Sequence, residues 1–145
     1  MVRVEVDVSK GMPAFDIVGL PDAAVRESRE RVRTAIRNSG LEFPFERITV
    51  NLAPADVKKE GANFDLAIAV GVLVATGQLT APEQDARLAK TAFLGELSLD
   101  GSLRRVNGVL PMSRILPENG VTNLVLPQPN AAEGALLGQT EVWGL

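Results

Sequence analysis

The sequence of 145 residues contains no histidine, no cysteine and no tyrosine. It therefore has no material for a Ser-His-Asp or Cys-His nucleophile, an imidazole acid or base, a thiolate metal cluster or a disulfide. The enzyme chemistry that is left is that of carboxylates, of a Ser/Thr-Lys pair, or of a hard metal ion held by oxygen ligands. The composition thus permits these three kinds of chemistry, or none.

Two kinds of segment are also missing. The longest nearly apolar run, residues 66–76, is far shorter than the roughly 20 residues of a transmembrane helix, and the N-terminus lacks the regions of a signal peptide. Neither a G-x-x-x-x-G-K-[ST] nor a G-x-G-x-x-G motif occurs, so the chain has no phosphate-cradling loop. We expect a cytoplasmic protein whose nucleotide chemistry, if it has any, lies outside this chain.

The composition that is present, 46% hydrophobic and 23% charged residues, is typical of one soluble globular domain. Periodicity and turn signals predict a mixed sheet packed with helices, an α/β (α+β) fold in a single domain over residues 1–145. The first strand begins almost at Met1, so we expect the natural chain to extend upstream and this piece to be excised from a longer protein. The predicted strands are 2–8, its partner 14–19, 47–52, 91–99, 102–106, 122–126 and 141–143, and the predicted helices are 22–39, 64–78, 108–119 and 130–137.

The helix 22–39 is strongly amphipathic, with Asp22 as its start signal and Gly40 as its stop. Its five arginines against three carboxylates leave a local excess of two positive charges, although the whole chain carries a net charge of −3. The alternative is a solvated face held by Arg26–Glu30 and Glu27–Arg31 pairs, with no aromatic side chain there for base stacking. The candidate residues for nucleic-acid or partner binding on this helix are Arg26, Arg29, Arg33 and Arg37.

The loop 53–63 precedes a helix that is apolar nearly all round. Long loops on rigid scaffolds often carry contacts, so its charged residues are a second set of binding candidates, and a purely solvated loop is the alternative. We expect Asn63 or Asp65 to cap the helix, and Gly71 to mark close packing against another backbone. The candidates in the loop are Asp56, Lys58, Lys59 and Glu60.

Of these kinds of chemistry, neither a Ser-Lys pair nor a metal site has a clear signature in the sequence. No serine opens the buried helix after a glycine-rich turn, and no lysine lies in an apolar run that would lower its pKa. An oxygen-rich Mg²⁺ site would need scattered carboxylates to converge in a spacing that matches no known loop, so we expect no metal site. The carboxylates considered for it are Asp56, Glu60, Asp65 and Glu96.

Several long segments together resemble one family. They are VEVDVSKGMPAFDIVGLPDAAVRESRERVRTAIRNSG, ITVNLAPADVKKEGANFDLAIAVGVLVATG, FLGELSLDGSLRRVNGVLP and NLVLPQPNAAEGALL. In this order they look like the N-terminal domain of magnesium-chelatase-like AAA+ ATPases of the ComM/YifB type, and the match covers essentially the whole chain. The resemblance implies a domain that precedes an AAA+ module, which would bind ATP and Mg²⁺.

The second half also resembles, more distantly, the proteolytic domain of the Lon family, which implies a Lon-like fold. That family carries its nucleophilic serine in a Gly-Pro-Ser-Ala-Gly turn, and its lysine past a hairpin that contains Gly-Glu. Asn63 stands at the serine position of this chain and Leu110 at the lysine position. An amide is no activated nucleophile and leucine accepts no proton, so the resemblance implies a scaffold without the peptidase activity.

ComM-type proteins resemble hexameric, DNA-associated motors that act during recombination and natural transformation. The resemblance therefore implies a non-catalytic domain that serves assembly, partner docking or DNA guidance on an ATPase ring. One alternative is an enzyme with a displaced site, either a Ser-Lys hydrolase that uses Ser98 or Ser113 with Lys58 or Lys90, or a Mg²⁺-dependent enzyme. Another is a peptide-binding module that uses the edge of strand 2–8.

Overall fold

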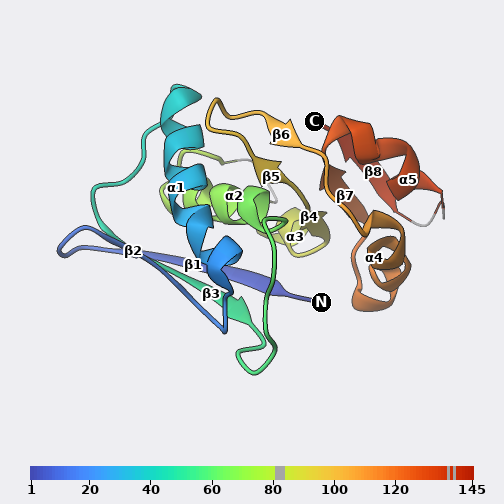
Figure 1. The fold of residues 1–145 in the computed structure, drawn as a ribbon, viewed down its shortest axis with the longest axis horizontal. Coiled ribbons are helices and arrows are strands. Elements are labelled where there is room, and N and C mark those ends of the chain that lie inside the picture. Colours follow the sequence, from blue (N-terminus) through green and yellow to red (C-terminus); the bar gives the residue numbers. More distant parts are fainter. Residues whose placement is uncertain (81–83, 137, 139) are drawn as a thin grey trace.

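The computed structural model describes residues 1–80, 84–136, 138 and 140–145. Its elements form a mixed α/β architecture, as the sequence predicts (Figure 1). None of the described helices is long and apolar enough to cross a membrane. The strands are β1 (Arg3–Ser9), β2 (Ala14–Val18), β3 (Arg47–Ala53), β4 (Thr91–Phe93), β5 (Glu96–Leu97), β6 (Leu103–Arg104), β7 (Asn123–Leu126) and β8 (Glu141–Gly144), and the helices are α1 (Ala23–Asn38), α2 (Asp65–Ala75), α3 (Gln84–Leu88), α4 (Val109–Ile115) and α5 (Ala131–Ala135), with short 3₁₀ turns at Pro117–Asn119 and Gln128–Asn130.

The N-terminal sheet has the strand order β1-β3-β2. The predicted pairing of the first two strands is therefore wrong, because β3 inserts between them, antiparallel to β1 and parallel to β2. The reason is the crossover: β2, α1 and β3 form a βαβ unit, which brings β3 back beside β2. β1 and β2 are thus both edge strands, and α1 and α2 cover one face of this sheet (Figure 1).

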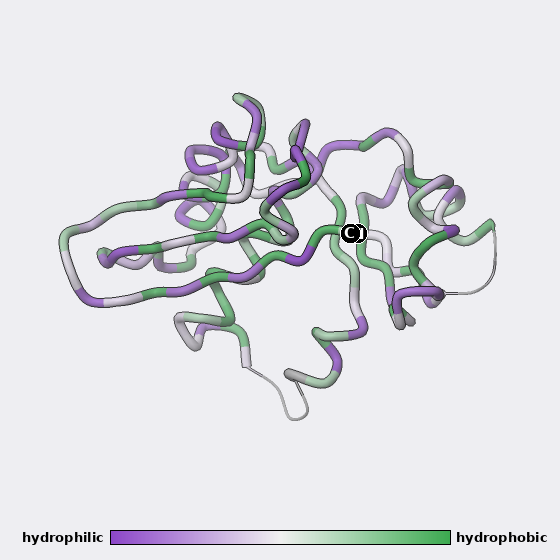
Figure 2. The backbone as a smooth tube through the Cα atoms, turned by 90° about the horizontal axis from the view of Figure 1, so that it is seen from below, coloured by the Kyte–Doolittle hydropathy of each residue, from purple (hydrophilic) through white to green (hydrophobic). Residues whose placement is uncertain are grey.

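A first hydrophobic cluster fills the space between this sheet and the two helices. Ile48, Val50 and Leu52 alternate along β3 and are fully buried, as the period of two requires for a half-covered strand. From the helices, Val32 and Val72 pack against them with no exposed surface. Figure 2 shows the resulting alternation of hydrophobic and hydrophilic residues along these strands.

Helix α2 departs from the prediction in two details. Phe64 is its N-cap residue and no side chain caps it, because the carboxylate of Asp65 is bound elsewhere. Gly71 does mark close packing, but against a side chain: a Cβ there would lie 2.5 Å from Cγ2 of Val6 on β1. The missing side chain is what lets α2 approach the sheet at this point.

The predicted strand 91–99 is two strands in different sheets. β4 joins the parallel sheet β4-β7-β8, whereas β5 forms a small hairpin with β6 around the predicted Asp100-Gly101 turn. The chain changes sheet at Gly95, whose backbone bonds to the residues at the start of α2. The Gly95 N–H donates to Asn63 O at 3.2 Å, and the Leu66 N–H donates to Gly95 O at 3.1 Å.

The C-terminal part has its own hydrophobic cluster, built by β7, α4 and their neighbours around Val109, Leu124 and Leu126. The predicted helix 108–119 ends earlier, at Ile115, and continues as a 3₁₀ turn from Pro117, because proline has no N–H for an α-helical hydrogen bond. The last strand is confirmed as β8. The predicted helix 130–137 is α5, and its predicted end at position 137 lies outside the described residues.

Candidate functional site

The outer face of α1 carries the arginines that the sequence singles out. Asp22 caps the helix, because its carboxylate accepts a hydrogen bond from the Val25 N–H at 2.8 Å. The apolar stripe of the helix, which includes Val25, Val32 and Ile36, faces the core. Burying that stripe leaves Arg26 and Arg37 exposed, with Arg29 and Arg33 half-exposed. From Arg26 to Arg37 this row spans about 16 Å, at ~1.5 Å of rise per residue.

Aromatic side chains lie beside this arginine row, contrary to the expectation from the helix alone. The guanidinium of Arg33 lies 5.5 Å from the ring centre of Phe43 and 6.0 Å from that of Phe15. Arg37 lies 5.9 Å from the Phe43 ring centre. Such cation–π contacts hold the guanidinium groups in place while their outer faces remain accessible. Phe45 follows in the same segment, and 85% of its surface is exposed.

Sequence reasoning did not select Phe43 and Phe45, because it considered the helix without the segment that follows it. A signal was present: Leu41–Glu46 reads L-E-F-P-F-E and brings two of the five phenylalanines together directly after the helix stop. Only the return of the chain toward β3 places these rings beside the arginines.

One of the two predicted salt bridges on α1 is present. Arg31 and Glu27 approach to 3.8 Å as predicted, whereas Glu30 pairs with Arg33 at 3.2 Å and not with Arg26. Arg29, which belongs to neither predicted pair, donates to backbone oxygens, to that of Arg26 at 3.1 Å and to that of Phe15 at 3.4 Å. Exposed pairs of this kind stabilise a protein by about 0–1 kcal/mol each.

The inner face of α1 holds a buried polar network that centres on Asp65 at the start of α2. The carboxylate of Asp65 accepts from Ser28 Oγ at 2.5 Å, from Arg31 Nε at 2.6 Å and from the Leu97 N–H at 3.0 Å. The hydrogen bond that Arg31 donates to Asp65 raises the pKa of Arg31 above its ordinary value. Asp65 therefore ties α1, α2 and β5 together and is not a free ligand for the metal site considered from the sequence.

The two positions that correspond to the Lon dyad are half-buried and belong to different elements. Asn63 precedes α2 and bonds to Gly95 through its backbone oxygen, as described above. Leu110 lies in the first turn of α4, where its N–H donates to Glu133 Oε1 of α5 at 3.1 Å. The side chains at both positions lack a nucleophile and a base.

The loop before α2 requires one correction. Lys59, a predicted surface contact, is only 1% exposed, and its ammonium group donates to the Pro54 oxygen. Its backbone pairs with the chain before α1, from its N–H to Leu20 O at 3.0 Å and from the Asp22 N–H to its O at 2.9 Å. The exposed candidates that remain are Asp56, Lys58 and Glu60, of which the last two approach each other to 3.8 Å.

The serines named for a displaced hydrolase have other partners. Ser113 donates to the Val109 oxygen at 2.9 Å, and Ser98 accepts from Arg104 Nε at 2.9 Å. Over the part of the chain that the structure describes, no hydrogen bond joins a serine to a lysine, and no group of three or more acidic side chains is placed to hold a metal ion. These contacts give the displaced-site alternative no support.

Comparison with known proteins now adds to this geometry. A family model described as subunit ChlI of Mg-chelatase matches residues 4–130. This chain belongs to that magnesium-chelatase-like family. The predicted resemblance to its ComM/YifB type is confirmed by 42% identity over 143 residues to the competence protein ComM of Haemophilus influenzae and 45% over 138 residues to YifB of Salmonella typhimurium.

The matches cover 99% and 95% of this chain but only 27% and 26% of those relatives. A weaker similarity, 27% identity over 114 residues, relates 79% of the chain to 19% of Lon protease 2 from Bacillus subtilis. Together with the mixed α/β architecture, this similarity confirms the predicted Lon-like fold class. In this family member, the two main groups of interacting polar side chains are the arginine row of α1 and the network around Asp65.

Proposed function

We propose that this chain is a non-catalytic accessory domain of a magnesium-chelatase-like AAA+ ATPase, and that it guides DNA along the outer face of α1. The observation that carries the proposal is the row of four arginines along one side of one helix, of which Arg26 and Arg37 are exposed and Arg29 and Arg33 are half-exposed.

The spacing and surroundings of the row suit a phosphate backbone. A span of about 16 Å covers about five phosphates of one strand, at ~3.4 Å each along a duplex axis. Within the row, one acidic side chain is paired with an arginine: Glu30 bonds to Arg33. The planar guanidinium groups of the arginines are well shaped for bidentate contacts with phosphate.

The residues at the Lon dyad positions support the proposal of a non-catalytic role. Asn63 and Leu110 supply neither a nucleophile nor a base, and the polar groups around α2 are bound to one another. ATP and Mg²⁺ would be bound by the AAA+ module of the same polypeptide. We propose that the full protein is a cytoplasmic hexamer and that this domain packs on its ring, with the exposed residues of loop 53–63 (Asp56, Lys58, Glu60) as further contacts.

A charge-reversal experiment tests the DNA contact. Arg29→Glu with Arg33→Glu is compared with Arg105→Glu with Arg114→Glu, a control of equal charge change on exposed arginines of the C-terminal part. Fluorescence anisotropy with labelled DNA at low salt should show a loss of affinity of about tenfold or more for the first variant only. The slope of log affinity against log salt should fall by about two, since ~0.9 counterion is released per phosphate contact.

Equal DNA binding by the two variants and the parent chain would remove α1 as a DNA contact. Thermal unfolding followed by circular dichroism checks that each variant is folded. In the full-length protein, deletion of residues 1–145 should reduce DNA binding and branch migration but leave a DNA-independent ATPase activity; unchanged branch migration would contradict the accessory role.

A further inference from the structure

The segment 41–46 joins α1 to β3 without forming a helix or a strand, and it bends just before β3. It is nevertheless held at both ends. Glu42 exchanges two hydrogen bonds with the Gln78 side chain, from the Glu42 N–H at 2.9 Å and to the Glu42 oxygen at 2.6 Å. The Glu46 oxygen accepts from the first N–H of β2 at 3.3 Å. Between these two anchors, Pro44 fixes one backbone torsion angle, which further limits the conformations open to the segment.

Three phenylalanine rings beside α1 differ in how much of their surface is free. Phe15 is buried, and Phe43 packs on it with the two ring centres 5.4 Å apart. The guanidinium groups of Arg33 and Arg37 lie over the Phe43 ring. Phe45 is 85% exposed and has no aromatic or cation–π contact within the described residues. Phe45 is therefore the ring of this group that can accept another flat molecule.

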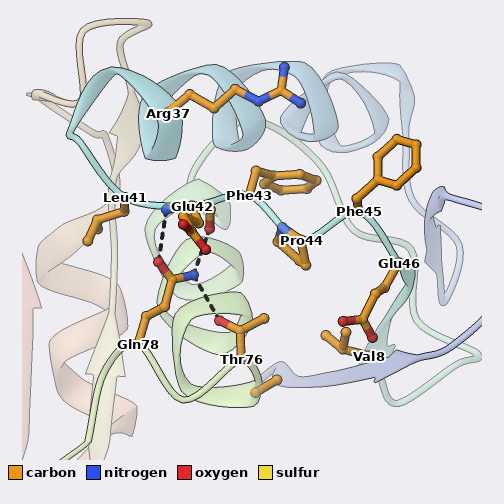
Figure 3. A pocket seen from close by; sticks show the side chains of 11 residues that line it. Val8, Arg37, Leu41, Glu42, Phe43, Pro44, Phe45, Glu46, Thr76 and Gln78 are labelled. Atoms are coloured by element: carbon orange, nitrogen blue, oxygen red, sulfur yellow. Dashed lines mark hydrogen bonds between the residues drawn. The ribbon is translucent and has the colours of Figure 1, made fainter.

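The exposed ring and the arginines lie on the same side of the segment. Figure 3 shows Phe43 and Phe45 on the side of α1, with Arg37 extending from that helix toward them. A hollow of about 220 Å³ lies there, lined by the three rings together with Arg33 and Arg37. Glu46 contributes to the border of the hollow, but its side chain points to the opposite side of the segment. An apolar aromatic surface and two cations thus border one hollow.

An exposed aromatic ring beside guanidinium groups suits a single strand of nucleic acid, in which bases stack on rings while cations follow the phosphates. A duplex does not use such a ring, because the faces of its bases are already stacked on one another. A single nucleotide is also a poorer fit than a strand. The arginine row continues from the hollow along α1 over about 16 Å, at ~1.5 Å per residue, which is several times the ~3.4 Å between phosphates along a strand.

We propose that the hollow beside Phe45 binds one base of a single DNA strand, which stacks on the Phe45 ring, and that Arg37 binds an adjoining phosphate. This inference rests on the proposed DNA contact of α1 and adds the kind of DNA that it accepts. Stacking tolerates any base, since every base has a π-face, so the site distinguishes a single strand from a duplex and does not read sequence. The Phe43 ring holds the Arg37 guanidinium in place, which lowers the loss of side-chain freedom on binding.

The test compares two labelled single strands of equal charge with this chain, by fluorescence anisotropy at low salt. One is a thymidine strand of about ten nucleotides, and the other has the same sugar-phosphate backbone without bases. The thymidine strand should bind about tenfold more tightly, because the stacking of one base contributes about that factor. Phe45→Ala should remove this difference and leave the affinity for a duplex unchanged. Phe45→Trp, which keeps a ring, should retain it.

A control variant and a direct reporter accompany this comparison. Leu99→Ala removes another exposed apolar side chain, on the turn between β5 and β6, and should change neither affinity. The chain has one tryptophan, so Trp143→Phe with Phe45→Trp places the only indole at position 45. Its fluorescence should be quenched by the thymidine strand and much less by the strand without bases or by a duplex. Thermal unfolding followed by circular dichroism checks that each variant is folded.

The stacking site is wrong if both single strands bind alike, or if Phe45→Ala weakens single-strand and duplex binding equally. Loss of binding in Arg29→Glu with Arg33→Glu, with no effect of Phe45→Ala, would overturn the stacking site and keep the proposed function. A base-dependent loss in Phe45→Ala alone would confirm the stacking site and remove the arginine row as a DNA contact. Absence of binding to every oligonucleotide would overturn both. Binding of a peptide rich in glutamate and phenylalanine in place of DNA, lost in Phe45→Ala, would assign the hollow to a protein partner.

Discussion

Arg31 and Arg33 lie two residues apart on α1, yet they belong to two different environments. Arg31 turns inward, where it donates to the fully buried carboxylate of Asp65 at 2.6 Å. Arg33 turns outward, where it pairs with the exposed Glu30 and lies over two aromatic rings. The two arginine side chains differ little in exposure, 18% against 31%, but their partners differ widely, since Asp65 is fully buried and Glu30 is 73% exposed. The partner, rather than the arginine itself, distinguishes the structural role of Arg31 from the more accessible position of Arg33.

The largest loss of stability is expected from a substitution on the inner face of α1. Asp65→Ala removes the carboxylate and leaves the Arg31 guanidinium, Ser28 and the Leu97 N–H without their shared acceptor. Breaking a buried ion pair by removing one partner costs about 3–5 kcal/mol. Urea unfolding followed by circular dichroism measures this loss of unfolding free energy. A loss below about 1 kcal/mol would place the Asp65 pair with the exposed pairs instead.

Ser28→Ala should have the next largest effect. It removes the hydrogen bond of 2.5 Å to Asp65 but keeps the ion pair, and a hydrogen bond to a charged group contributes about 1.5–3 kcal/mol. The matched control on the same helix is Glu27→Ala, which removes the exposed 3.8 Å contact to Arg31 and should change stability by less than about 1 kcal/mol. If both variants lose the same unfolding free energy, the inner and outer faces of α1 do not differ in how much their polar contacts stabilise the protein.

Asp22→Ala should cost an intermediate amount. The Asp22 side chain accepts from the Val25 N–H at 2.8 Å and weakly from the Gly61 N–H at 3.3 Å, so it joins the start of α1 to the loop before α2. Loss of an N-cap side chain typically costs about 1 kcal/mol. Asp22→Asn and Asp22→Ser, which both keep a capping oxygen, should recover most of this loss in the same urea titration.

The smallest effect on stability is expected at the outer face. Arg29→Gln with Arg33→Gln should change the unfolding free energy by less than about 0.5 kcal/mol per site, as for most exposed substitutions. The same variant should lower DNA affinity and its dependence on salt. A large loss of stability with unchanged DNA binding would reverse the roles of the two faces.

The inner and outer faces were not equally predictable from the sequence. The helical period of 3.6 alone separates Val25, Val32 and Ile36 from the arginine row, so α1 and its buried stripe agree with the prediction. The partner of Arg31 was not predictable in this way, because Asp65 is 34 positions away and meets Arg31 only when α2 packs on α1. For the same reason the rings beside Arg33 were missed.

The strand order of the N-terminal sheet and the burial of Lys59 were not predictable from the sequence either, because both depend on contacts between distant segments. Alternation in 2–8 and 14–19 predicts two strands but not that β3 lies between them, since both edges of a strand have the same period. Lys59 lies in a charged stretch that predicts exposure. It is buried because its backbone pairs with the corner before α1, a long-range contact that no local pattern contains.

The buried ammonium of Lys59 also gives this chain a chemical reporter. The other three lysines, Lys10, Lys58 and Lys90, are exposed. An amine-reactive reagent applied to the folded protein should therefore acylate those three rapidly and Lys59 slowly. Mass spectrometry of the labelled peptides would then follow the opening of one loop against the start of α1 directly, at a single atom, while the rest of the protein remains folded.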